Sequence, residues 1–256
     1  MDTSDLFSLK GRTALITGGS RGIGRMIAAG FLAQGARVYI SARKADACNK
    51  TAAELSKLGH CVSLPCDVST VDGAKALAAA YAALEGSLDI LVNNAGAAWG
   101  AAFDEFPESG WDKVVDLNLK TPFFLTQALA GPLRKAAAAR PAKVINIASI
   151  DGLSVNPQET YSYAASKAGL VHLTRRMALR LIQDNIVVSA IAPGAFASDM
   201  NKDARDRGEA VAARIPAKRI GRDEDMAAAA IYLASRAGDY VVGATLVVDG
   251  GVTCAR

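Results

Sequence analysis

Tyr163 and Lys167 stand four positions apart in the run Tyr163-Ala-Ala-Ser-Lys167, where a helix places both side chains on one face. A free phenol has a pKa of about 10 and a nearby ammonium group stabilises its phenolate, so such a pair is typical of proton transfer. Ser149 lies fourteen positions earlier and carries a hydroxyl suited to hydrogen-bond the same substrate oxygen. The alternative interpretation is a tyrosine and a lysine on an exposed helix surface, which give the same spacing.

A glycine-rich turn follows a short apolar run near the start of the chain. Gly18, Gly22 and Gly24 have the spacing G-x-x-x-G-x-G and lead into a helical pattern. Glycines allow the backbone to approach a pyrophosphate, and the free N–H groups at the start of a helix attract that anion. The turn therefore predicts a nucleotide site. Flavin and sugar-nucleotide proteins share this arrangement, and a plain strand-to-helix loop also fits it.

Charge at the end of the second predicted strand indicates which dinucleotide binds. A protein that binds NAD usually ends this strand with an acidic residue, which binds the ribose 2′-hydroxyl. Here the strand ends Ile40-Ser-Ala-Arg43 without an acid, and Arg21 lies inside the glycine turn. Because arginine pairs with phosphate in bidentate geometry, two guanidinium groups suit a 2′-phosphate. We therefore predict NADPH as the coenzyme; the alternative is two solvated surface arginines.

The elements that must position these residues alternate between strand and helix along the chain. Strands are predicted at residues 13–16, 37–42, 61–65, 88–92, 143–148, 187–192 and 245–248. Helices are predicted at residues 24–34, 45–58, 71–84, 107–119, 121–139, 161–184 and 223–235, with a bend near Pro122. This alternation predicts one α/β domain over residues 1–256, a Rossmann-type doubly wound parallel sheet of about seven strands with helices on both faces.

In such a sheet, ligands bind at the edge where the strands end. The residues just beyond the predicted strands are Gly18 to Gly24, Arg43, Asp67, Asn93 to Gly96, Ser149 and Pro193-Gly194. The candidate residues therefore converge on one edge, and this convergence predicts a site more strongly than any single motif.

Composition excludes several classes of protein. The chain has 256 residues, 51% of them apolar and 21% charged, which suits one sizeable domain. Its net charge of +4 is dispersed, so we expect no nucleic-acid partner. No apolar run approaches the roughly 18 residues of a membrane span, and the acidic start lacks a signal-peptide pattern. The four cysteines and two histidines have no metal-type or redox-type spacing, so we expect no metal and a cytoplasmic location.

Seven motifs have the order and spacing of the short-chain dehydrogenase/reductase family and span the chain from about residue 10 to residue 251. They are Thr17-Gly-Gly-Ser-Arg-Gly-Ile-Gly24, Asn93-Asn-Ala-Gly96, Asn118, Ser149, Tyr163-x-x-x-Lys167, Pro193-Gly194 and Val248-Asp-Gly-Gly251. The chain resembles this family and, within it, the 3-ketoacyl reductases. The resemblance implies an NADPH-dependent reductase that transfers hydride to a ketone. The implied substrate is a 3-ketoacyl thioester, reduced to the 3-hydroxyacyl form in glycolipid or fatty-acid synthesis.

The resemblance also implies catalytic roles for single residues. Tyr163 would protonate the carbonyl oxygen, and Ser149 would orient the carbonyl. Lys167 would lower the pKa of Tyr163 and hold the nicotinamide ribose. Asn118 would support a water that relays protons to Lys167.

The coenzyme contacts that the resemblance implies lie along the same edge. They are Gly18, Ser20, Arg21, Gly22, Ile23, Gly24, Arg43, Asp67, Val68, Asn94, Ala95, Gly96, Tyr163, Lys167, Pro193, Gly194, Phe196 and Ser198. Ser198 stands where the family often has threonine, an exchange that keeps the hydroxyl. For Asp67, a helix-capping role is the alternative.

Fewer residues bear on the substrate. Residues 195–221 correspond to the family's mobile lid. Candidates for an apolar wall along an acyl chain, or else for core positions, are Trp99, Ala101, Ala102, Phe103 and Phe106. Asp151 lies near the predicted pocket mouth and argues against a purely apolar pocket. The charged run 201–209 is interpreted as a solvated face, with contact to an acidic carrier protein or a coenzyme phosphate as the alternative.

Relatives pair through the long helices that correspond to residues 121–139 and 161–184, so we expect a homo-oligomer, a tetramer or a dimer. Arg180 stands where relatives often carry glutamate, so contacts between subunits can differ. The expected partner is a small ketone or an acyl thioester, free, coenzyme-linked or carrier-linked. Two alternative functions remain: a reductase of another ketone, such as a small ketone, sugar or steroid, and an NADPH-binding regulatory protein without turnover.

Overall fold

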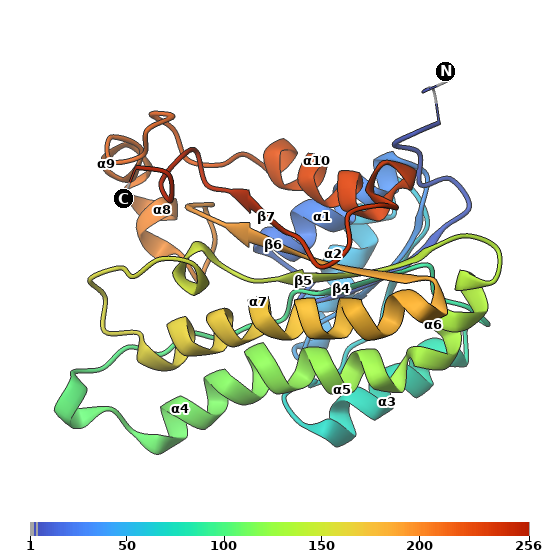
Figure 1. Cartoon of the computed structure of the whole chain (residues 1–256), viewed down its shortest axis with the longest axis horizontal. Helices are drawn as coiled ribbons and strands as arrows, with labels where there is room; N and C mark the ends of the chain where they lie inside the picture. The colour runs from blue at the N-terminus through green and yellow to red at the C-terminus, as the bar shows by residue number, and fades with distance from the viewer. Residues whose placement is uncertain (1–2, 4, 256) are drawn as a thin grey trace.

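The buried apolar runs of the sequence pair into one parallel sheet. The structure, a computed structural model, describes residue 3 and residues 5–255. Within them, seven strands pair in the order β3-β2-β1-β4-β5-β6-β7, with every neighbouring pair parallel (Figure 1). The strands are β1 (Thr13–Thr17), β2 (Arg37–Ser41), β3 (Cys61–Ser63), β4 (Ile90–Asn93), β5 (Ala142–Ile147), β6 (Ile186–Pro193) and β7 (Thr245–Val248). The predicted doubly wound α/β sheet is confirmed.

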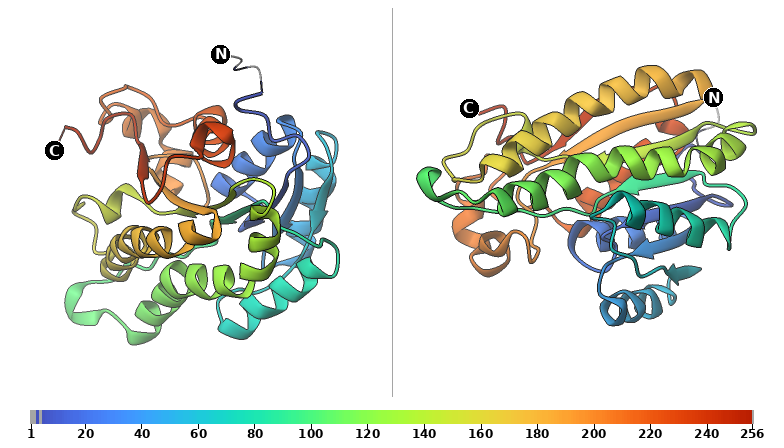
Figure 2. Two further views of the ribbon diagram at one scale, coloured as in Figure 1. Left: turned by 45° about the vertical axis from the view of Figure 1, so that its right-hand side comes forward. Right: turned by 90° about the horizontal axis from the view of Figure 1, so that it is seen from below.

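Helices cover both faces of this sheet (Figure 2). One face carries α1 (Gly22–Ala33), α2 (Ala45–Leu55) and α10 (Asp223–Ala234). The other carries α3 (Val71–Ala82), α4 (Glu108–Val115), α5 (Thr121–Ala128), α6 (Ala130–Ala137) and α7 (Tyr161–Leu181). None of the helices among the described residues combines the length and apolarity that crossing a membrane requires.

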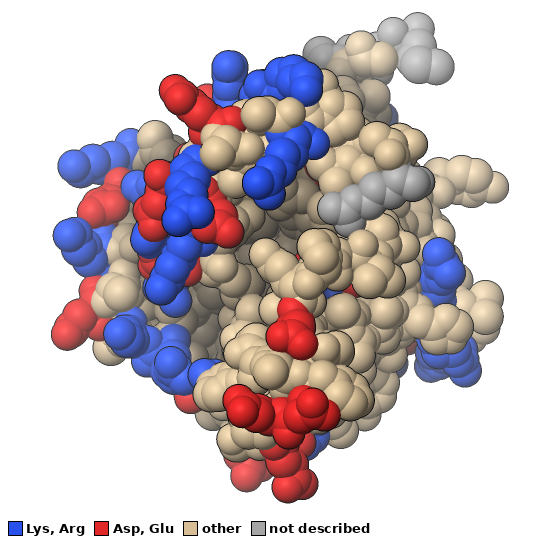
Figure 3. All heavy atoms as spheres, turned by 90° about the vertical axis from the view of Figure 1, so that its left-hand side faces the viewer, with Lys and Arg blue, Asp and Glu red and all other residues tan. Residues whose placement is uncertain are grey.

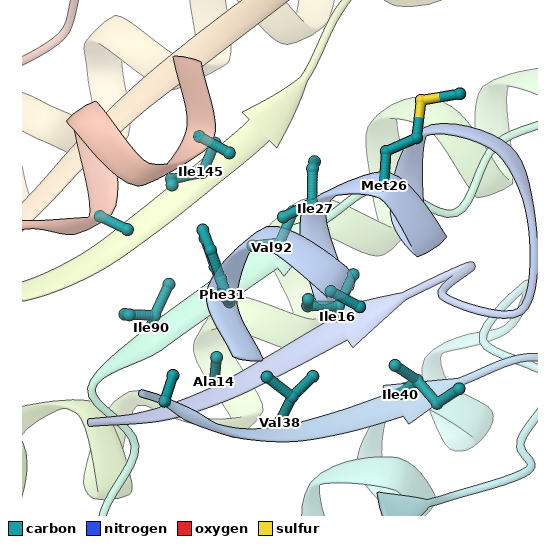
Figure 4. Close-up of a cluster of buried hydrophobic side chains, with 14 of the residues drawn as sticks. Ala14, Ile16, Met26, Ile27, Phe31, Val38, Ile40, Ile90, Val92 and Ile145 are labelled. Carbon is teal, nitrogen blue, oxygen red and sulfur yellow. The ribbon is translucent and has the colours of Figure 1, made fainter. Parts of the chain in front are cut away.

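Successive side chains of a strand enter opposite cores, because the strand repeat is two residues. In β1, Ala14 and Ile16 lie in the core shared with α1 and α10, whereas Leu15 between them lies in the core shared with α3, α5 and α7. Figure 4 shows the first core, where Ile27 and Phe31 of α1 lie among the strand side chains. Burial on both faces explains why the central strands read as continuous apolar runs.

The two ends of the sheet differ in what they hold. We call the side where the strands begin the amino edge and the side where they end the carboxyl edge. Connections from β1 and β4, neighbours at the centre of the sheet, leave toward opposite faces, which opens a crevice at the carboxyl edge. Two short helices that the sequence did not predict, α8 (Lys202–Asp206) and α9 (Gly208–Ala212), lie at this edge within residues 195–221.

The long helical stretch after β4 differs from its prediction. A local irregularity does lie near Pro122, because the helix is continuous here and Pro122 has no N–H to donate to the Asn118 carbonyl four residues earlier. The irregularity is a π turn at Asp116–Lys120, which contains Asn118 and directly precedes α5. A second break at Leu129 separates α5 from α6. The wide turn at Asn118 therefore lies where proline removes a helical hydrogen bond.

Candidate active site

Ser149, Tyr163 and Lys167 meet at the carboxyl edge. Tyr163 and Lys167 lie one turn apart on α7, and Lys167 Nζ is 5.6 Å from the centroid of the Tyr163 ring. The buried Lys167 Nζ donates to the Ile147 carbonyl oxygen at 2.7 Å. Ser149 follows β5, and its Oγ accepts the Asp151 N–H at 3.1 Å as the cap of a short 3₁₀ turn, Ile150–Gly152. Because that N–H occupies the Ser149 oxygen, the hydroxyl proton is left to donate toward the site.

Burial sets the protonation states of this cluster. It raises the pKa of Tyr163 to about 12; a hydrogen bond with Ser149 opposes this rise and the charge of Asp151 adds to it. Burial alone lowers the pKa of Lys167 to about 8. Desolvation is the largest cause for both groups, and the charge of Lys167 is not among the causes that act on the pKa of Tyr163. The phenol is held protonated, as a proton donor, and the ammonium gives up its proton near pH 8.

Asn118 ties the loop after β4 to α7. Its Oδ1 accepts the Ala97 N–H at 2.8 Å, and its Nδ2 donates to the Ala97 carbonyl at 2.9 Å and to Ser166 Oγ at 3.1 Å. Ser166 Oγ in turn donates to the Tyr163 carbonyl at 2.8 Å. Since the Asn118 amide is engaged on both sides, any relay water at this residue depends on its main chain. Ser166, which the sequence analysis passed over, links Asn118 to the Tyr163 turn.

The glycine turn has the shape of an anion cradle. Gly18 has φ +65°, and a Cβ there would lie 2.8 Å from Asn94 Nδ2. A Cβ on Gly24 would clash with the Gly18 carbonyl, so both positions require glycine. Among the described residues no side chain caps the start of α1, and its first N–H groups stay available to an anion. These features fit the pyrophosphate of a dinucleotide.

Thr17 fixes this cradle to the neighbouring strand. Its Oγ1 accepts the N–H groups of Asn94 and Ala95, each at 3.0 Å, and Asn94 Nδ2 donates to the Thr17 carbonyl at 2.8 Å. From the sequence, Thr17 is only the first residue of the glycine-turn motif. Its position as the last residue of β1, beside the β4 loop, is the signal that points to this role.

The two arginines predicted for the 2′-phosphate differ in their surroundings. Arg43 is exposed and has no hydrogen-bond or ion-pair partner among the described residues. Arg21 instead reaches the segment after β6, where its NH1 lies 2.5 Å from Asp199 Oδ2. The structure therefore leaves one guanidinium group free and engages the other with an acid that the sequence analysis did not single out.

The remaining adenosine-side residues lie after β3. Asp67 is exposed, and its Oδ1 accepts the Ser69 N–H at 3.0 Å. Thr70, not Asp67, caps α3 by accepting the Gly73 N–H at 3.0 Å, so the helix-capping alternative for Asp67 is wrong. Val68 is buried, and its carbonyl accepts the Thr121 hydroxyl.

On the nicotinamide side, Pro193 ends β6 and is buried, and Gly194 packs on Asp249. The Phe196 ring is 2% exposed and packs on Gly221 in the core, so any contact with coenzyme falls to its backbone. An isolated bridge between Phe196 and Gly221 holds this backbone in place, and a contact of Phe196 with the nicotinamide stays a prediction for its main chain.

The beginning of the 195–221 segment reaches across the site. Ser198 Oγ accepts the Asn201 N–H at 3.1 Å. A Cβ on Gly96 would lie 3.8 Å from the Met200 methyl carbon, so Met200 approaches the loop after β4. Figure 3 looks onto this edge and shows a hollow, with basic and acidic side chains intermingled beside it. Met200, at 52% exposed, is a further site residue that sequence reasoning missed.

The aromatic residues proposed as an acyl wall do not form one surface. The Trp99 ring packs on α4 at Gly110, with Lys113 Nζ 5.1 Å from its centroid. Phe103 and Phe106 line a surface groove of about 470 Å³, together with Pro107, Glu108, Trp111 and Tyr161. Since side chains two positions apart on a helix point in different directions, this groove lies away from the Tyr163 side of α7.

No cluster of three or more histidine, cysteine, aspartate or glutamate side chains suited to a metal ion occurs in the described part of the chain. The chemistry that the described residues offer is proton donation and anion binding.

Comparison with known proteins places the chain among nucleotide-dependent oxidoreductases. Residues 18–253 match the family model described as enoyl-(acyl carrier protein) reductase. The chain is 49% identical, over 96% of its length and 97% of the relative's, to the rhamnolipids biosynthesis 3-oxoacyl-[acyl-carrier-protein] reductase of Pseudomonas aeruginosa.

Two solved structures resemble this chain over nearly its whole length. The Pseudomonas aeruginosa RhlG/NADP active-site complex superposes with a TM-score of 0.94 at 49% identity, covering 97% of this chain and 99% of that one. A gluconate 5-dehydrogenase from Burkholderia cenocepacia, in complex with NADP and tartrate, gives a TM-score of 0.89 at 35% identity, covering 98% and 99%.

Proposed function

The chain belongs to the short-chain dehydrogenase/reductase family, and from this premise we propose that it is an NADPH-dependent reductase of 3-ketoacyl thioesters. One observation carries the proposal: Ser149 and Tyr163 present two hydroxyl donors together, with the amine of Lys167 behind the phenol. Two donors aimed at one oxygen suit a carbonyl on which negative charge develops. The Pseudomonas relative, whose name gives a 3-oxoacyl substrate, supports the thioester.

The coenzyme fits the cradle described above. The pyrophosphate would lie at the start of α1, over Gly18, Ser20, Gly22, Ile23 and Gly24, and Arg43 would bind the 2′-phosphate. Asp67 and Val68 would border the adenine. The loop from Asn94 to Gly96 and the backbone from Pro193 to Ser198 would border the nicotinamide.

Bound NADPH supplies the hydride. Ser149 donates a hydrogen bond to the substrate carbonyl oxygen and orients it. Tyr163, protonated because burial raises its pKa to about 12, gives its proton to that oxygen. Lys167 then reprotonates the phenolate. It uses one of its three N–H donors on the Ile147 carbonyl and keeps two for the ribose and Tyr163.

Asp151 favours an uncharged acyl group at the reacting end of the substrate. Its charge acts on Tyr163, since it raises the pKa of that phenol. A substrate carboxylate placed directly beside the reacting carbonyl, as in a 2-keto acid, would meet this like charge. A thioester carries no charge at that position, so Asp151 supports the thioester over a 2-keto acid.

The direct test is the fall in NADPH absorbance at 340 nm with a panel of ketones. The panel contains 3-ketoacyl chains that are free, coenzyme-linked and carrier-linked, together with keto sugar acids, small ketones and a steroid ketone. We expect the largest kcat/KM with a 3-ketoacyl thioester. A larger value with any other ketone would overturn the substrate, and NADPH binding without turnover on the whole panel would favour a regulatory protein.

We also propose a homo-oligomer and a cytoplasmic location, as the sequence analysis predicts. Apolar side chains on α5 and at the end of α7 support the first: Phe123 is 39% exposed, Leu179 68% and Ile182 38%. These are the helices through which the family resemblance implies pairing. Light scattering of the purified chain measures the subunit number.

A further inference from the structure

Arg21 connects the glycine turn to the segment after β6. It follows the turn that cradles the pyrophosphate, and its NH1 lies 2.5 Å from Asp199 Oδ2. The backbones meet here too, since a Cβ on Gly22 would lie 3.2 Å from the Ser198 Cβ. The ion pair therefore ties two segments, far apart in sequence, beside the start of α1, where the coenzyme phosphates bind.

Asp199 has a second arginine partner. Arg205 of α8 donates from NH1 to Asp199 Oδ1 at 2.7 Å, and from Nε and NH2 to Asp206 at 2.7 and 3.0 Å. Arg21 and Arg205 thus take different oxygens of one carboxylate. If Arg21 leaves, Asp199 keeps Arg205 and is not stranded. The contact with Arg21 is also open to water, because the side chains of Arg21 and Asp199 are 73% and 48% exposed.

We propose that Asp199 is a determinant of coenzyme selectivity. Its carboxylate is an internal anion that binds Arg21 until the 2′-phosphate of NADPH replaces the carboxylate. This inference rests on the proposed function, since it requires an NADPH site. A 2′-phosphate offers Arg21 a dianion with bidentate geometry, whereas the 2′-hydroxyl of NADH offers no charge. Only the coenzyme with a 2′-phosphate displaces Asp199 from Arg21. Its binding frees the first residues of the 195–221 segment from the glycine turn.

Trypsin reports on this release, because Lys202, Arg205 and Arg207 are cleavage sites inside the segment. The probe is adenosine 2′,5′-bisphosphate, which carries the 2′-phosphate but lacks the nicotinamide half, and adenosine 5′-monophosphate is its control. In the wild-type protein we expect the bisphosphate to accelerate cleavage within residues 202–207 by about two- to fivefold, which corresponds to the free energy that an exposed ion pair contributes. We expect no acceleration from the monophosphate.

Two variants separate the two acids that bind Arg205, of which only Asp199 also binds Arg21. In Asp199→Asn, cleavage should be fast without nucleotide and unchanged by the bisphosphate. Asp206→Asn removes the other acid bound to Arg205, and it should respond as the wild type does. By calorimetry, Asp199→Asn should bind NADPH about two- to fivefold more tightly than the wild type, with no change for NADH.

Three results would overturn the proposal. The first is equal acceleration by both nucleotides, the second is a wild-type response in Asp199→Asn, and the third is weaker NADPH binding by that variant. If these occur while the wild type binds and oxidises NADPH, only the role of Asp199 fails. If the wild type binds neither NADPH nor the bisphosphate, the proposed function fails with it.

Discussion

Lys143 lies at the amino edge of the sheet and Lys167 at the carboxyl edge, and both side chains are almost fully buried. Lys143 Nζ forms an ion pair with Asp239 Oδ1 at 2.7 Å, whereas Lys167 Nζ donates to a carbonyl oxygen. Burial lowers the pKa of both amines, but Asp239 opposes this effect at Lys143. At the amino edge Asp239 therefore favours the charged form of the buried amine, whereas at the carboxyl edge the amine of Lys167, with a pKa of about 8, has a carbonyl oxygen as its partner.

Other charges of the amino edge are paired in the same way. Asp89 accepts the Thr13 N–H at 2.9 Å and forms ion pairs with Arg140 at 3.2 Å and Arg12 at 3.8 Å. Arg12 also donates to the carbonyl oxygens of Ala234 and Pro141. At the carboxyl edge, Arg43 has no such partner among the described residues. The difference separates groups that hold the fold from Arg43, which we propose binds the coenzyme phosphate.

The largest expected effect compares the half-buried Tyr163 with the fully buried Tyr81. Tyr163→Phe removes the proposed proton donor, so kcat should fall about 10²–10⁴-fold while NADPH still binds. Tyr81→Phe is the matched control, because the Tyr81 hydroxyl donates to the Ser87 carbonyl at 2.8 Å beside the amino edge. It should cost about 1 kcal/mol of unfolding free energy and leave kcat unchanged. Steady-state kinetics and urea unfolding distinguish the two, and undiminished turnover by Tyr163→Phe would refute the assigned role.

The two lysine sites should differ in what a substitution costs: turnover at Lys167 and stability at Lys143. Lys167→Met should lower kcat about a hundredfold or more, with the unfolding free energy within about 1 kcal/mol of the wild type, because it removes a buried amine that lacks a carboxylate partner.

Asp239→Asn leaves Lys143 buried without its charge partner. It should lower the unfolding free energy by about 1–3 kcal/mol at an unchanged kcat. Unfolding curves and kinetics on the same samples check both variants. Similar stability losses in the two would remove the distinction between the edges.

A smaller effect concerns the arginines of the two edges. Arg43→Ala should raise the KM for NADPH about tenfold and change the KM for NADH little, because only NADPH carries the phosphate. Arg140→Ala, at the amino edge, should leave both KM values unchanged. Equal effects of Arg43→Ala on the two coenzymes would contradict the 2′-phosphate assignment.

Local pattern was enough to predict the sheet and the edge of the sheet at which the candidate residues meet. Strands buried on both faces read as continuous apolar runs, and the residues that follow them, such as Ser149, converge because parallel strands end at one edge. Helical spacing placed Tyr163 and Lys167 on one face of a helix, but their catalytic roles came from the resemblance to the short-chain dehydrogenase/reductase family. These predictions depend on residues close together in sequence or on the regularity of the sheet.

What the sequence did not predict depends on contacts between distant segments. Arg21 meets Asp199 only because the chain after β6 folds back over the glycine turn. Phe196 turns into the core because Gly221 leaves room for its ring. The π turn contains Asn118, whose side-chain amide donates to the Ala97 carbonyl and to Ser166 Oγ, two groups far from it in sequence. The short helices α8 and α9 could not be predicted, because residues 202–212 carry charges of both signs and neither helix shows an apolar repeat.

The central claim is that Lys167, which has no carboxylate partner among the described residues, supplies protons to Tyr163. The most direct measurement of this claim is the pH dependence of ketone reduction at saturating NADPH. Lys167 carries its proton below its pKa of about 8 and loses it above. We therefore predict a kcat/KM that is constant below about pH 7 and falls about tenfold for each pH unit above pH 8. Asp239→Asn should keep this profile, since Lys143 takes no part. A rate that stays constant from pH 7 to pH 10 would contradict the claim.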